Sequence, residues 1–218
     1  MDRYAVIGNP VAHSKSPLIH EAFARATGQR MSYERLLAPL DGFVATVERF
    51  VAEGGRGLNV TVPFKLEAFA LGREKTSRAA EAQACNTLAW RGDHWYADNT
   101  DGVGLMRDLT HNLHEALAGR DVLVLGAGGA TRGILGPLLA QAPRSVVVLN
   151  RTERRAAELA ASFAQHGPVA AMSSAQLNGR RFDVVINATS IGIHDDVTEN
   201  LWPRRPFASG SLAYDLVY

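Results

Sequence analysis

A lysine and an aspartate suited to proton transfer lie in the first half of the chain. Lys65 ends the segment Leu58-Asn-Val-Thr-Val-Pro-Phe-Lys65, and Asp101 stands within Asn99-Thr-Asp-Gly102. The ammonium group of a lysine has a pKa of about 10.4 in water, so its surroundings must bring it into range before it can serve as a general acid or base. An aspartate beside it could hold the ammonium and share its proton. Each residue alone has a simpler explanation. Lys65 could be a solvated surface lysine, and Asp101 could be the N-cap of a helix.

A glycine-rich turn follows these two residues and points to a nucleotide. It lies directly after the apolar residues 121–125 and consists of Gly126, Ala127, Gly128, Gly129 and Ala130. A strand that enters a helix through such a turn lets the backbone approach a pyrophosphate, with helix N–H groups facing the anion. Thr131 stands where the usual fingerprint has its third glycine or alanine. The pattern alone fits a plain tight turn as well as it fits a dinucleotide site.

The end of the next predicted strand distinguishes NAD from NADP. Sites that prefer NAD have an Asp or Glu here, which bonds the ribose 2′-hydroxyl. This chain has instead Asn150, Arg151, Thr152 and Arg155. Arginine forks and a hydroxyl suit a 2′-phosphate, which a carboxylate would repel. The cluster also fits the solvated start of a basic helix, but beside the glycine turn it favours NADP.

Small polar residues in the first half form a second group of candidates. Ser14 and Ser16 lie at a predicted helix start, where hydroxyl donors and the positive end of the helix dipole can bind a carboxylate. An N-cap role explains Ser16 without any ligand, but it does not explain Ser14. Asn59 and Thr61 are two residues apart on a predicted strand and therefore face the same side. With Lys65 just beyond them, this grouping could bind a polyhydroxylated ring and place an ammonium at a reacting oxygen.

Two successive alternations of strand and helix must position these residues. The first has predicted strands at residues 4–7, 31–37 and 57–62, a hairpin of residues 86–90 and 94–97, and helices at 16–27 and 40–53 with two short ones before residue 84. The second has predicted strands at residues 121–125, 145–149, 169–171, 183–186 and 211–217, and helices at 130–141 and 154–165. Small polar residues from Asn187 to Thr189 end one of these strands, where doubly wound sheets bind ligands.

The alternation predicts an α/β fold of two domains. Residues 1–101 would form a mixed-sheet α/β substrate domain, and residues 119–218 a Rossmann-type doubly wound nucleotide-binding domain. Apolar residues at helical spacing predict a linking helix at residues 102–118.

The composition is that of an ordinary globular protein. With 46% hydrophobic residues and a net charge of +1, the chain gives no general electrostatic reason to expect nucleic acid or an anionic membrane as partner. Its single cysteine, Cys85, excludes an intramolecular disulfide, and no Cys/His spacing predicts a metal site. No signal-like segment and no apolar run of about 20 residues is found, so a cytoplasmic protein is expected.

In order and spacing, these motifs together resemble the shikimate dehydrogenase family from one end of the chain to the other. The matching segments are Gly8-Asn-Pro10 with Ser14-Lys-Ser-Pro17, Asn59-Val-Thr61-Val-Pro-Phe-Lys65, Asn86-Thr87, Asn99-Thr-Asp-Gly102, Gly126–Ala130, Asn150-Arg-Thr152 and Asn187-Ala-Thr-Ser190. The resemblance implies the reversible, NADPH-dependent reduction of 3-dehydroshikimate to shikimate in aromatic amino-acid biosynthesis, by a monomer or homodimer.

The resemblance also implies a role for each candidate residue. Lys65 would be the general acid/base, with Asp101 as its partner. Ser14 and Ser16 would hold the substrate carboxylate, and the ring would contact Asn59, Thr61, Asn86, Asp101 and Tyr218. The cofactor would contact the turn from Gly126 to Ala130, then Asn150, Arg151, Thr152, Arg155, Thr189 and Leu216.

The chain departs from the family at its end. It stops at Tyr218, whereas family members continue with a Pro-containing loop, a substrate-binding glutamine and terminal helices. Low turnover of this chain, or none, is therefore expected. Two alternatives stay open: a quinate/shikimate dehydrogenase of broader specificity, and a non-catalytic relative that binds ligand without hydride transfer.

Overall fold

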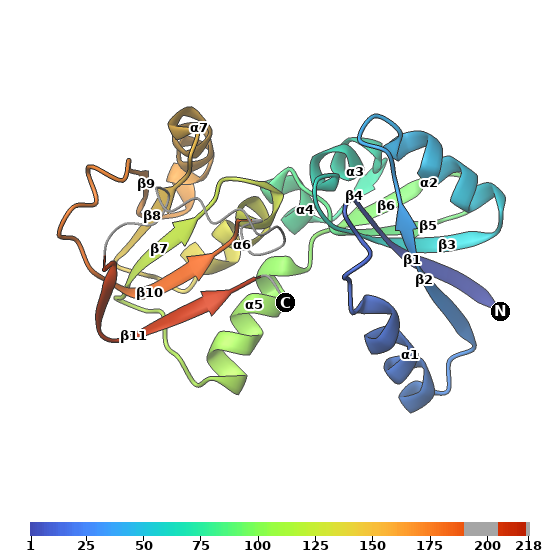
Figure 1. Cartoon of the computed structure of the whole chain (residues 1–218), viewed down its shortest axis with the longest axis horizontal. Coiled ribbons are helices and arrows are strands. Elements are labelled where there is room, and N and C mark those ends of the chain that lie inside the picture. The colour runs from blue at the N-terminus through green and yellow to red at the C-terminus, as the bar shows by residue number, and fades with distance from the viewer. Residues whose placement is uncertain (190–204, 217–218) are drawn as a thin grey trace. The chain divides into compact units, whose positions relative to one another are not determined.

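The computed structural model describes residues 1–189 and 205–216. The chain divides into two compact units, Met1–Thr100 and Asp101–Tyr218, each with its own sheet and core. Figure 1 shows both units, with the strands of each sheet labelled. None of the helices in the described residues is both long and apolar enough to cross a membrane.

A six-stranded mixed sheet forms the centre of the first unit. Its strand order is β2-β1-β3-β5-β6-β4. The strands are β1 (Asp2–Gly8), β2 (Met31–Leu37), β3 (Gly55–Val60), β4 (Glu74–Lys75), β5 (Thr87–Trp90) and β6 (Trp95–Asp98). β1 pairs in parallel with β2 and β3, whereas β5 is antiparallel to both β3 and β6. The predicted mixed sheet is therefore confirmed, with the hairpin inserted beside β3.

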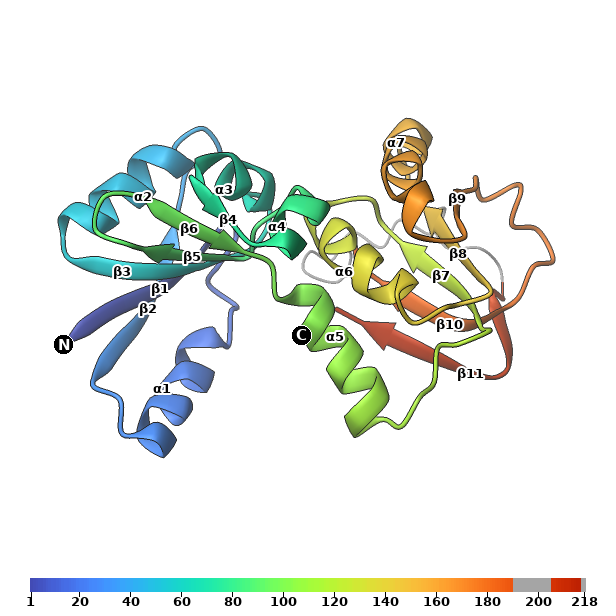
Figure 2. The same cartoon turned by 180° about the vertical axis from the view of Figure 1, so that it is seen from behind.

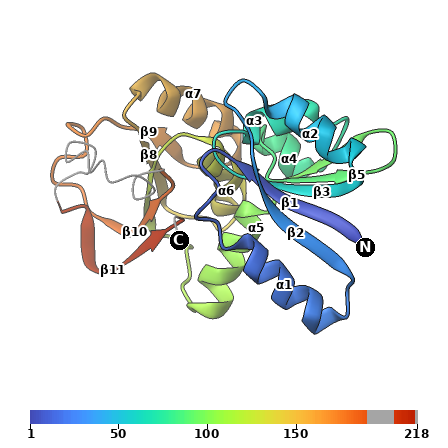
Figure 3. The ribbon, with the colours of Figure 1, turned by 45° about the vertical axis from the view of Figure 1, so that its right-hand side comes forward.

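Helices cover both faces of this sheet. They are α1 (Ser16–Thr27), α2 (Phe43–Ala52), α3 (Lys65–Leu71) and α4 (Ser77–Ala82). Phe43 and Phe50 of α2 pack in one core with Ala5 and Ile7, the inward residues of β1. Because successive strand residues point to opposite faces, Tyr4 and Val6 face the other way, toward α1. Figure 3 shows α1 and α2 on opposite faces of the sheet.

The third strand begins two residues earlier than the predicted 57–62. Gly55 pairs with Arg3, although the pair Gly54-Gly55 is typical of a turn. A Cβ at Gly55 would overlap the Phe50 ring of α2, so the glycine is needed for close packing rather than for a turn. Thr61 consequently lies just beyond the strand, although its N–H still bonds the Ile7 carbonyl at 2.9 Å.

A five-stranded, all-parallel sheet forms the second unit, in the order β11-β10-β7-β8-β9. Its strands are β7 (Asp121–Leu125), β8 (Ser145–Leu149), β9 (Val169–Ala171), β10 (Phe182–Asn187) and β11 (Phe207–Asp215). The chain runs outward from β7 to β9 and then returns to the other side of β7 with β10. Figure 2 shows the strands from behind. The carboxyl ends of β7 and β10 therefore form the switch point at which such sheets bind ligands.

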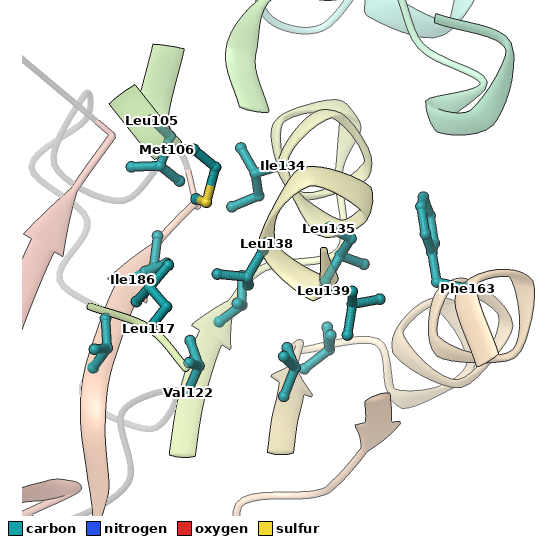
Figure 4. Close-up of a cluster of buried hydrophobic side chains, with 14 of the residues drawn as sticks. Leu105, Met106, Leu117, Val122, Ile134, Leu135, Leu138, Leu139, Phe163 and Ile186 are labelled. Atoms are coloured by element: carbon teal, nitrogen blue, oxygen red, sulfur yellow. The ribbon is translucent and has the colours of Figure 1, made fainter. Parts of the chain in front are cut away.

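The three central strands of this second sheet, β7, β8 and β10, are buried on both faces. One face packs against α5 (Asp101–Arg107), α6 (Gly129–Leu139) and α7 (Glu153–Phe163), as Figure 4 shows for part of the cluster. Alternate residues such as Leu123 and Val147 point to the opposite face, where they meet Leu177. This two-sided burial explains why the strands are nearly continuous apolar runs.

The predicted linking helix is shorter than the sequence pattern indicates. α5 ends at Arg107, and a π-helical turn (Asp108–Asn112) follows. Leu113, predicted to lie on the apolar face of the helix, is 45% exposed. The turn is held to the last strand instead, because Tyr214 donates a 2.7 Å hydrogen bond to Asp108 Oδ2. Burial, and then this hydrogen bond, raise the pKa of Tyr214 to about 12.

Candidate functional site

Several candidate residues meet at one edge of the mixed sheet. β1 and β3 are parallel and both end there, and the antiparallel β5 begins there, with Thr87 opposite Asn59. Gly8 at the end of β1 lies so close to the Thr61 side chain that a Cβ would overlap its methyl group. The topology therefore brings the Gly8-Asn-Pro10, Asn59-Val-Thr61 and Asn86-Thr87 motifs together, although they are far apart in sequence.

The two serines adopt a different capping arrangement from the one predicted. Ser14, not Ser16, bonds the start of α1, because Ser14 Oγ accepts the Ser16 N–H at 3.2 Å. Ser16 is already helical and its own side chain caps nothing. The two hydroxyls lie 3.1 Å apart, and Ser14 is only 5% exposed. The Ser14 hydroxyl thus accepts the first N–H of the helix, although the N-cap residue itself is Lys15.

Arg35 of β2 anchors this serine loop, and sequence reasoning missed it. Its Nε and Nη2 both donate to the Ser14 carbonyl oxygen, at 2.9 and 2.6 Å. A lone arginine in an exposed strand carries no motif. Its role follows only from the parallel pairing of β2 with β1, which places Arg35 opposite Val6, two residues before Gly8.

A chain of hydrogen bonds links Asn59 to Asn86. Tyr33 Oη donates to Asn59 Oδ1 at 2.6 Å, and Asn59 Nδ2 reaches Thr87 Oγ1 at 3.4 Å. Thr87 Oγ1 donates to Asn86 Oδ1 at 2.9 Å, an oxygen that also accepts the Thr100 N–H at 2.9 Å. Both amides, predicted as ring-binding residues, thus belong to one network that ends at the residue before Asp101.

Lys65 is the first residue of α3, just past the end of β3. Its carbonyl oxygen accepts the Cys85 N–H at 2.8 Å, which ties the start of this helix to the residue before Asn86. Asp101 is the first residue of α5 and follows Thr100 directly. Because Asp101 begins the second unit, the pairing of its carboxylate with Lys65 stays a prediction.

Asp98 holds the turn that leads to Asp101. Its carboxylate accepts hydrogen bonds from Thr76 Oγ1 at 2.7 Å, from Arg78 Nε and Nη2 at 2.7 and 2.5 Å, and from the Asn99 N–H at 2.7 Å. Asp98 is 8% exposed, and the Arg78 guanidinium lowers the pKa of this carboxyl group. Neither residue was among the predicted candidates, because their pairing depends on α4 packing against β6.

Cys85 is fully buried beside this site. Burial raises the pKa of its thiol to about 11, and Sγ lies 3.0 Å from the Thr87 carbonyl oxygen. A buried thiol with a raised pKa is largely protonated at neutral pH and is therefore a poor nucleophile.

The glycine turn of the second unit has the backbone form that a pyrophosphate site requires. Gly126 has φ +104°, and a Cβ there would come 2.9 Å from the Ala188 carbonyl oxygen of the neighbouring strand end. Thr131, the departure from the usual fingerprint, is fully buried and donates to the Gly126 carbonyl at 2.9 Å. Thr131 therefore fits at the position of the usual glycine or alanine, and its hydroxyl stabilises the turn. A Cβ at Gly128 would meet no atom of the described residues within 4 Å.

The basic cluster begins where β8 ends. Asn150 Nδ2 donates to the Thr152 carbonyl at 3.0 Å, and Thr152 is the N-cap of α7 without using its side chain as a cap. Arg154 pairs with Glu158 at 2.7 Å, one turn along the helix. No ion pair of Arg151 or Arg155 is found within the described part of the chain. These two exposed arginines and the Thr152 hydroxyl are suited to a phosphate.

Asn187 organises the other side of the switch point. Its Oδ1 accepts the Thr189 N–H and hydroxyl at 3.1 and 2.6 Å, and its carbonyl accepts the Leu216 N–H at 3.0 Å. Its Nδ2 donates to Asp215 at 3.1 Å. The structure thus brings Thr189 and Leu216 to adjacent strand ends. The predicted substrate residue Tyr218 lies outside the described residues, as does Ser190.

The fold and the two groups of residues define a class of protein. A mixed-sheet unit with polar residues at one edge precedes a parallel sheet of Rossmann-type order, with a glycine turn at its switch point. A nicotinamide-dependent oxidoreductase has such an organisation.

Known proteins of similar sequence and structure identify the family. Residues 6–88 match the shikimate dehydrogenase substrate binding domain, and residues 108–200 match the shikimate / quinate 5-dehydrogenase family. The NADP(+) shikimate dehydrogenase of Chromobacterium violaceum is 54% identical over 217 residues, which are 100% of this chain and 79% of that protein. The chain belongs to the shikimate dehydrogenase family.

Two shikimate dehydrogenases are among the solved structures that share the fold. Shikimate dehydrogenase from Aquifex aeolicus superposes with a TM-score of 0.86 at 31% identity, and covers 100% of this chain and 79% of its own. Shikimate 5-dehydrogenase from Thermus thermophilus in complex with NADP(H) and shikimate superposes with a TM-score of 0.81 at 32% identity, with the same coverage.

Proposed function

We propose that this protein catalyses the reversible, NADP-dependent reduction of 3-dehydroshikimate to shikimate, a step of aromatic amino-acid biosynthesis. The observation that carries the proposal is the convergence of Ser14, Asn59, Asn86 and Lys65 at one edge of the mixed sheet. Hydroxyls, amides and an ammonium together match a ligand with a carboxylate, ring hydroxyls and a carbonyl. Relatives named NADP(+) shikimate dehydrogenase, 54% identical over the whole chain, support the same conclusion.

The mixed-sheet unit would bind the substrate. The Ser14 and Ser16 hydroxyls can rotate toward a carboxylate at the start of α1. Asn59, Thr61 and Asn86 would bond ring hydroxyls, with Tyr218 as a further contact proposed from the family resemblance alone. In functional terms we assign residues 1–101 to the substrate, residues 102–118 to the link and residues 119–218 to the cofactor.

Lys65 would move the proton of the reaction. In the reducing direction its ammonium gives a proton to the substrate carbonyl oxygen as that oxygen becomes a hydroxyl, and it takes the proton back in the oxidising direction. Asp101 would orient the ammonium and share its proton. NADPH, when bound, supplies the hydride that the carbonyl carbon receives.

The parallel-sheet unit fits NADP. The backbone at Gly128 leaves room for a pyrophosphate at the start of α6, and the basic cluster offers Arg151, Thr152 and Arg155 to a 2′-phosphate. Gly126, Ala127, Gly129 and Ala130 complete the turn, and Asn150, Thr189 and Leu216 flank it. As part of the same proposal, the enzyme works in the cytoplasm as a monomer or homodimer.

The test is an assay of the purified chain with shikimate and NADP⁺, following the reduced nicotinamide. The Lys65→Met variant should lower turnover by about 10²–10⁴-fold while still binding shikimate. Lys75→Met is the control, because the Lys75 ammonium bonds the Gly72 carbonyl and lies over the Phe69 ring.

Two results would count against the proposal. One is a wild-type chain that shows no turnover with either substrate and nucleotide pair and also binds neither shikimate nor NADP⁺. The other is a Lys65→Met variant that retains wild-type turnover. Quinate and NAD⁺ in the same assay would reveal the broader specificity of a quinate/shikimate dehydrogenase.

A further inference from the structure

Tyr33 lies on the edge strand β2, yet its hydroxyl reaches Asn59 on β3. The strand β1 runs between them, and Tyr33 is opposite Tyr4, which is opposite Gly57. Gly57 has no side chain, and a Cβ there would come 3.2 Å from the Tyr4 ring. The Tyr33 hydroxyl therefore extends along this face of the sheet to bond Asn59 Oδ1 at 2.6 Å.

The Tyr33 ring is held between α1 and the sheet. It stacks on His20 of α1, with ring centroids 4.0 Å apart and planes at 12°. His20 Nδ1 in turn lies 2.9 Å from the Ser16 carbonyl oxygen. The helix that begins at the proposed carboxylate site thus also fixes the ring whose hydroxyl bonds Asn59.

The hydrogen bonds from Tyr33 onward all run in one direction. Tyr33 donates to Asn59, Asn59 to Thr87, and Thr87 to Asn86. If the Asn59 amide were flipped, its oxygen would face a Thr87 hydroxyl whose proton is already given to Asn86. The flipped amide would also present N–H groups to the Tyr33 hydroxyl. The network therefore favours one orientation of the amide, and successive bonds of this kind reinforce one another.

We propose that Tyr33 is a positioning residue that fixes Asn59 as a hydrogen-bond donor to a ring hydroxyl oxygen of shikimate. An amide nitrogen carries two hydrogens, and the network uses one of those on Asn59, so the second serves the ligand. The inference rests on the proposed function and adds to it a residue that does not itself touch the substrate. Tyr33 acts by donating a hydrogen bond to the Asn59 oxygen. The amide then turns its nitrogen, and not its oxygen, toward the ligand.

The experiment measures shikimate binding by calorimetry, which does not depend on turnover. The variants are Tyr33→Phe, Asn59→Ala and the double variant. Tyr33→Phe keeps the ring that stacks on His20 and removes only the hydroxyl. Tyr4→Phe is the matched control, since Tyr4 lies on the adjacent strand and its hydroxyl makes no hydrogen bond to the described residues.

Tyr33→Phe should weaken shikimate binding by about 3–10-fold, the effect of one lost hydrogen bond. In the Asn59→Ala background the same change should have less than about a twofold effect, because the group that Tyr33 positions is gone. NADP⁺ binding should remain that of the wild type, and the thermal midpoint should fall by only about 2–4 °C, the effect of one lost intramolecular hydrogen bond. Tyr4→Phe should match the wild type throughout.

Unchanged shikimate binding in Tyr33→Phe, beside normal binding by the wild type, would overturn the inference and leave the proposed function intact. An equal loss in the Asn59→Ala background would also overturn it, because Tyr33 would then act independently of Asn59. A wild-type chain that does not bind shikimate would overturn both.

Discussion

Gly102 lies directly against the carbonyl oxygen of Gly133, where α5 crosses α6. A Cβ at Gly102 would overlap that oxygen and would also come 2.6 Å from Pro137 Cγ. Gly102→Ala should therefore lower the free energy of unfolding by about 1–3 kcal/mol, the usual cost of overpacking. Urea unfolding, followed by circular dichroism, measures this difference.

Gly104, two residues along the same helix, is the matched control. A Cβ there would meet no atom of the described residues within 4 Å. Gly104→Ala should stabilise the protein by about 0.5–1 kcal/mol, because alanine favours the helix. Equal effects of the two substitutions would contradict the close crossing of the helices.

Gly128→Ala should separate ligand binding from folding. The added methyl group would meet open space, so the free energy of unfolding should change by less than about 1 kcal/mol. If the pyrophosphate approaches this backbone, NADP⁺ binding should weaken by about tenfold or more. Gly126→Ala should instead destabilise the fold, because Gly126 has φ +104° and lies against Ala188. Normal NADP⁺ binding by Gly128→Ala would place the nucleotide elsewhere.

The basic cluster should distinguish NADP⁺ from NAD⁺. Arg151→Ala and Arg155→Ala should each weaken NADP⁺ binding by about tenfold and leave NAD⁺ binding nearly unchanged, since only NADP⁺ has the 2′-phosphate. Arg154→Ala is the control, because Arg154 is paired with Glu158 at 2.7 Å. Binding of both nucleotides is measured by calorimetry. A parallel loss of NAD⁺ affinity would argue against contact with the 2′-phosphate.

Arg35 should affect shikimate binding through the serine loop. Arg35→Met removes both N–H donors to the Ser14 carbonyl and should weaken shikimate binding by about tenfold. Arg35→Lys keeps the positive charge but not the planar fork, so it should restore only part of the affinity. Full recovery with lysine would mean that charge, rather than the position of Ser14, governs binding.

Asp98 should make the stability depend on pH. The Arg78 guanidinium lowers the pKa of this carboxyl group below the ordinary 3.8, so the ionised form stabilises the fold above that pH. This contribution is lost as the pH falls through the lowered pKa. Wild type should therefore exceed Asp98→Asn by about 1.5–3 kcal/mol at neutral pH, the value of a charged hydrogen bond, and by less in acid. Urea unfolding at several pH values measures this. A difference that does not change with pH would contradict it.

Local patterns predicted much of the fold. The strands at residues 31–37, 121–125, 145–149 and 169–171 have the bounds that the sequence predicts. For 121–125 and 145–149 the reason is an apolar run that stops at a turn residue, Gly126 or Asn150. β11 begins at Phe207 rather than at residue 211. Its first residues include Gly210 with φ +73°, which is typical of a turn, but Phe207 pairs with Phe182 of β10. Tertiary pairing there outweighs the local preference.

The candidate site could be predicted only where a residue belongs to a motif. Lys65, Asn59 and the glycine turn are recognisable from sequence, although their roles stay predictions. Tyr33 and Arg35 could not be found in this way, because their importance depends on β2 lying beside β1. That Ser14, and not Ser16, accepts an N–H at the start of α1 depends on the path of the loop before the helix, which residue spacing does not determine.

The burial of Cys85 makes the protein convenient for spectroscopy. It is the chain's single cysteine, and a thiol with a pKa of about 11 scarcely reacts with maleimides at neutral pH. Cysteines introduced at exposed positions would therefore carry a fluorophore or spin label without a competing background. One label in each unit would report how the distance between the units changes as shikimate and NADP⁺ are added.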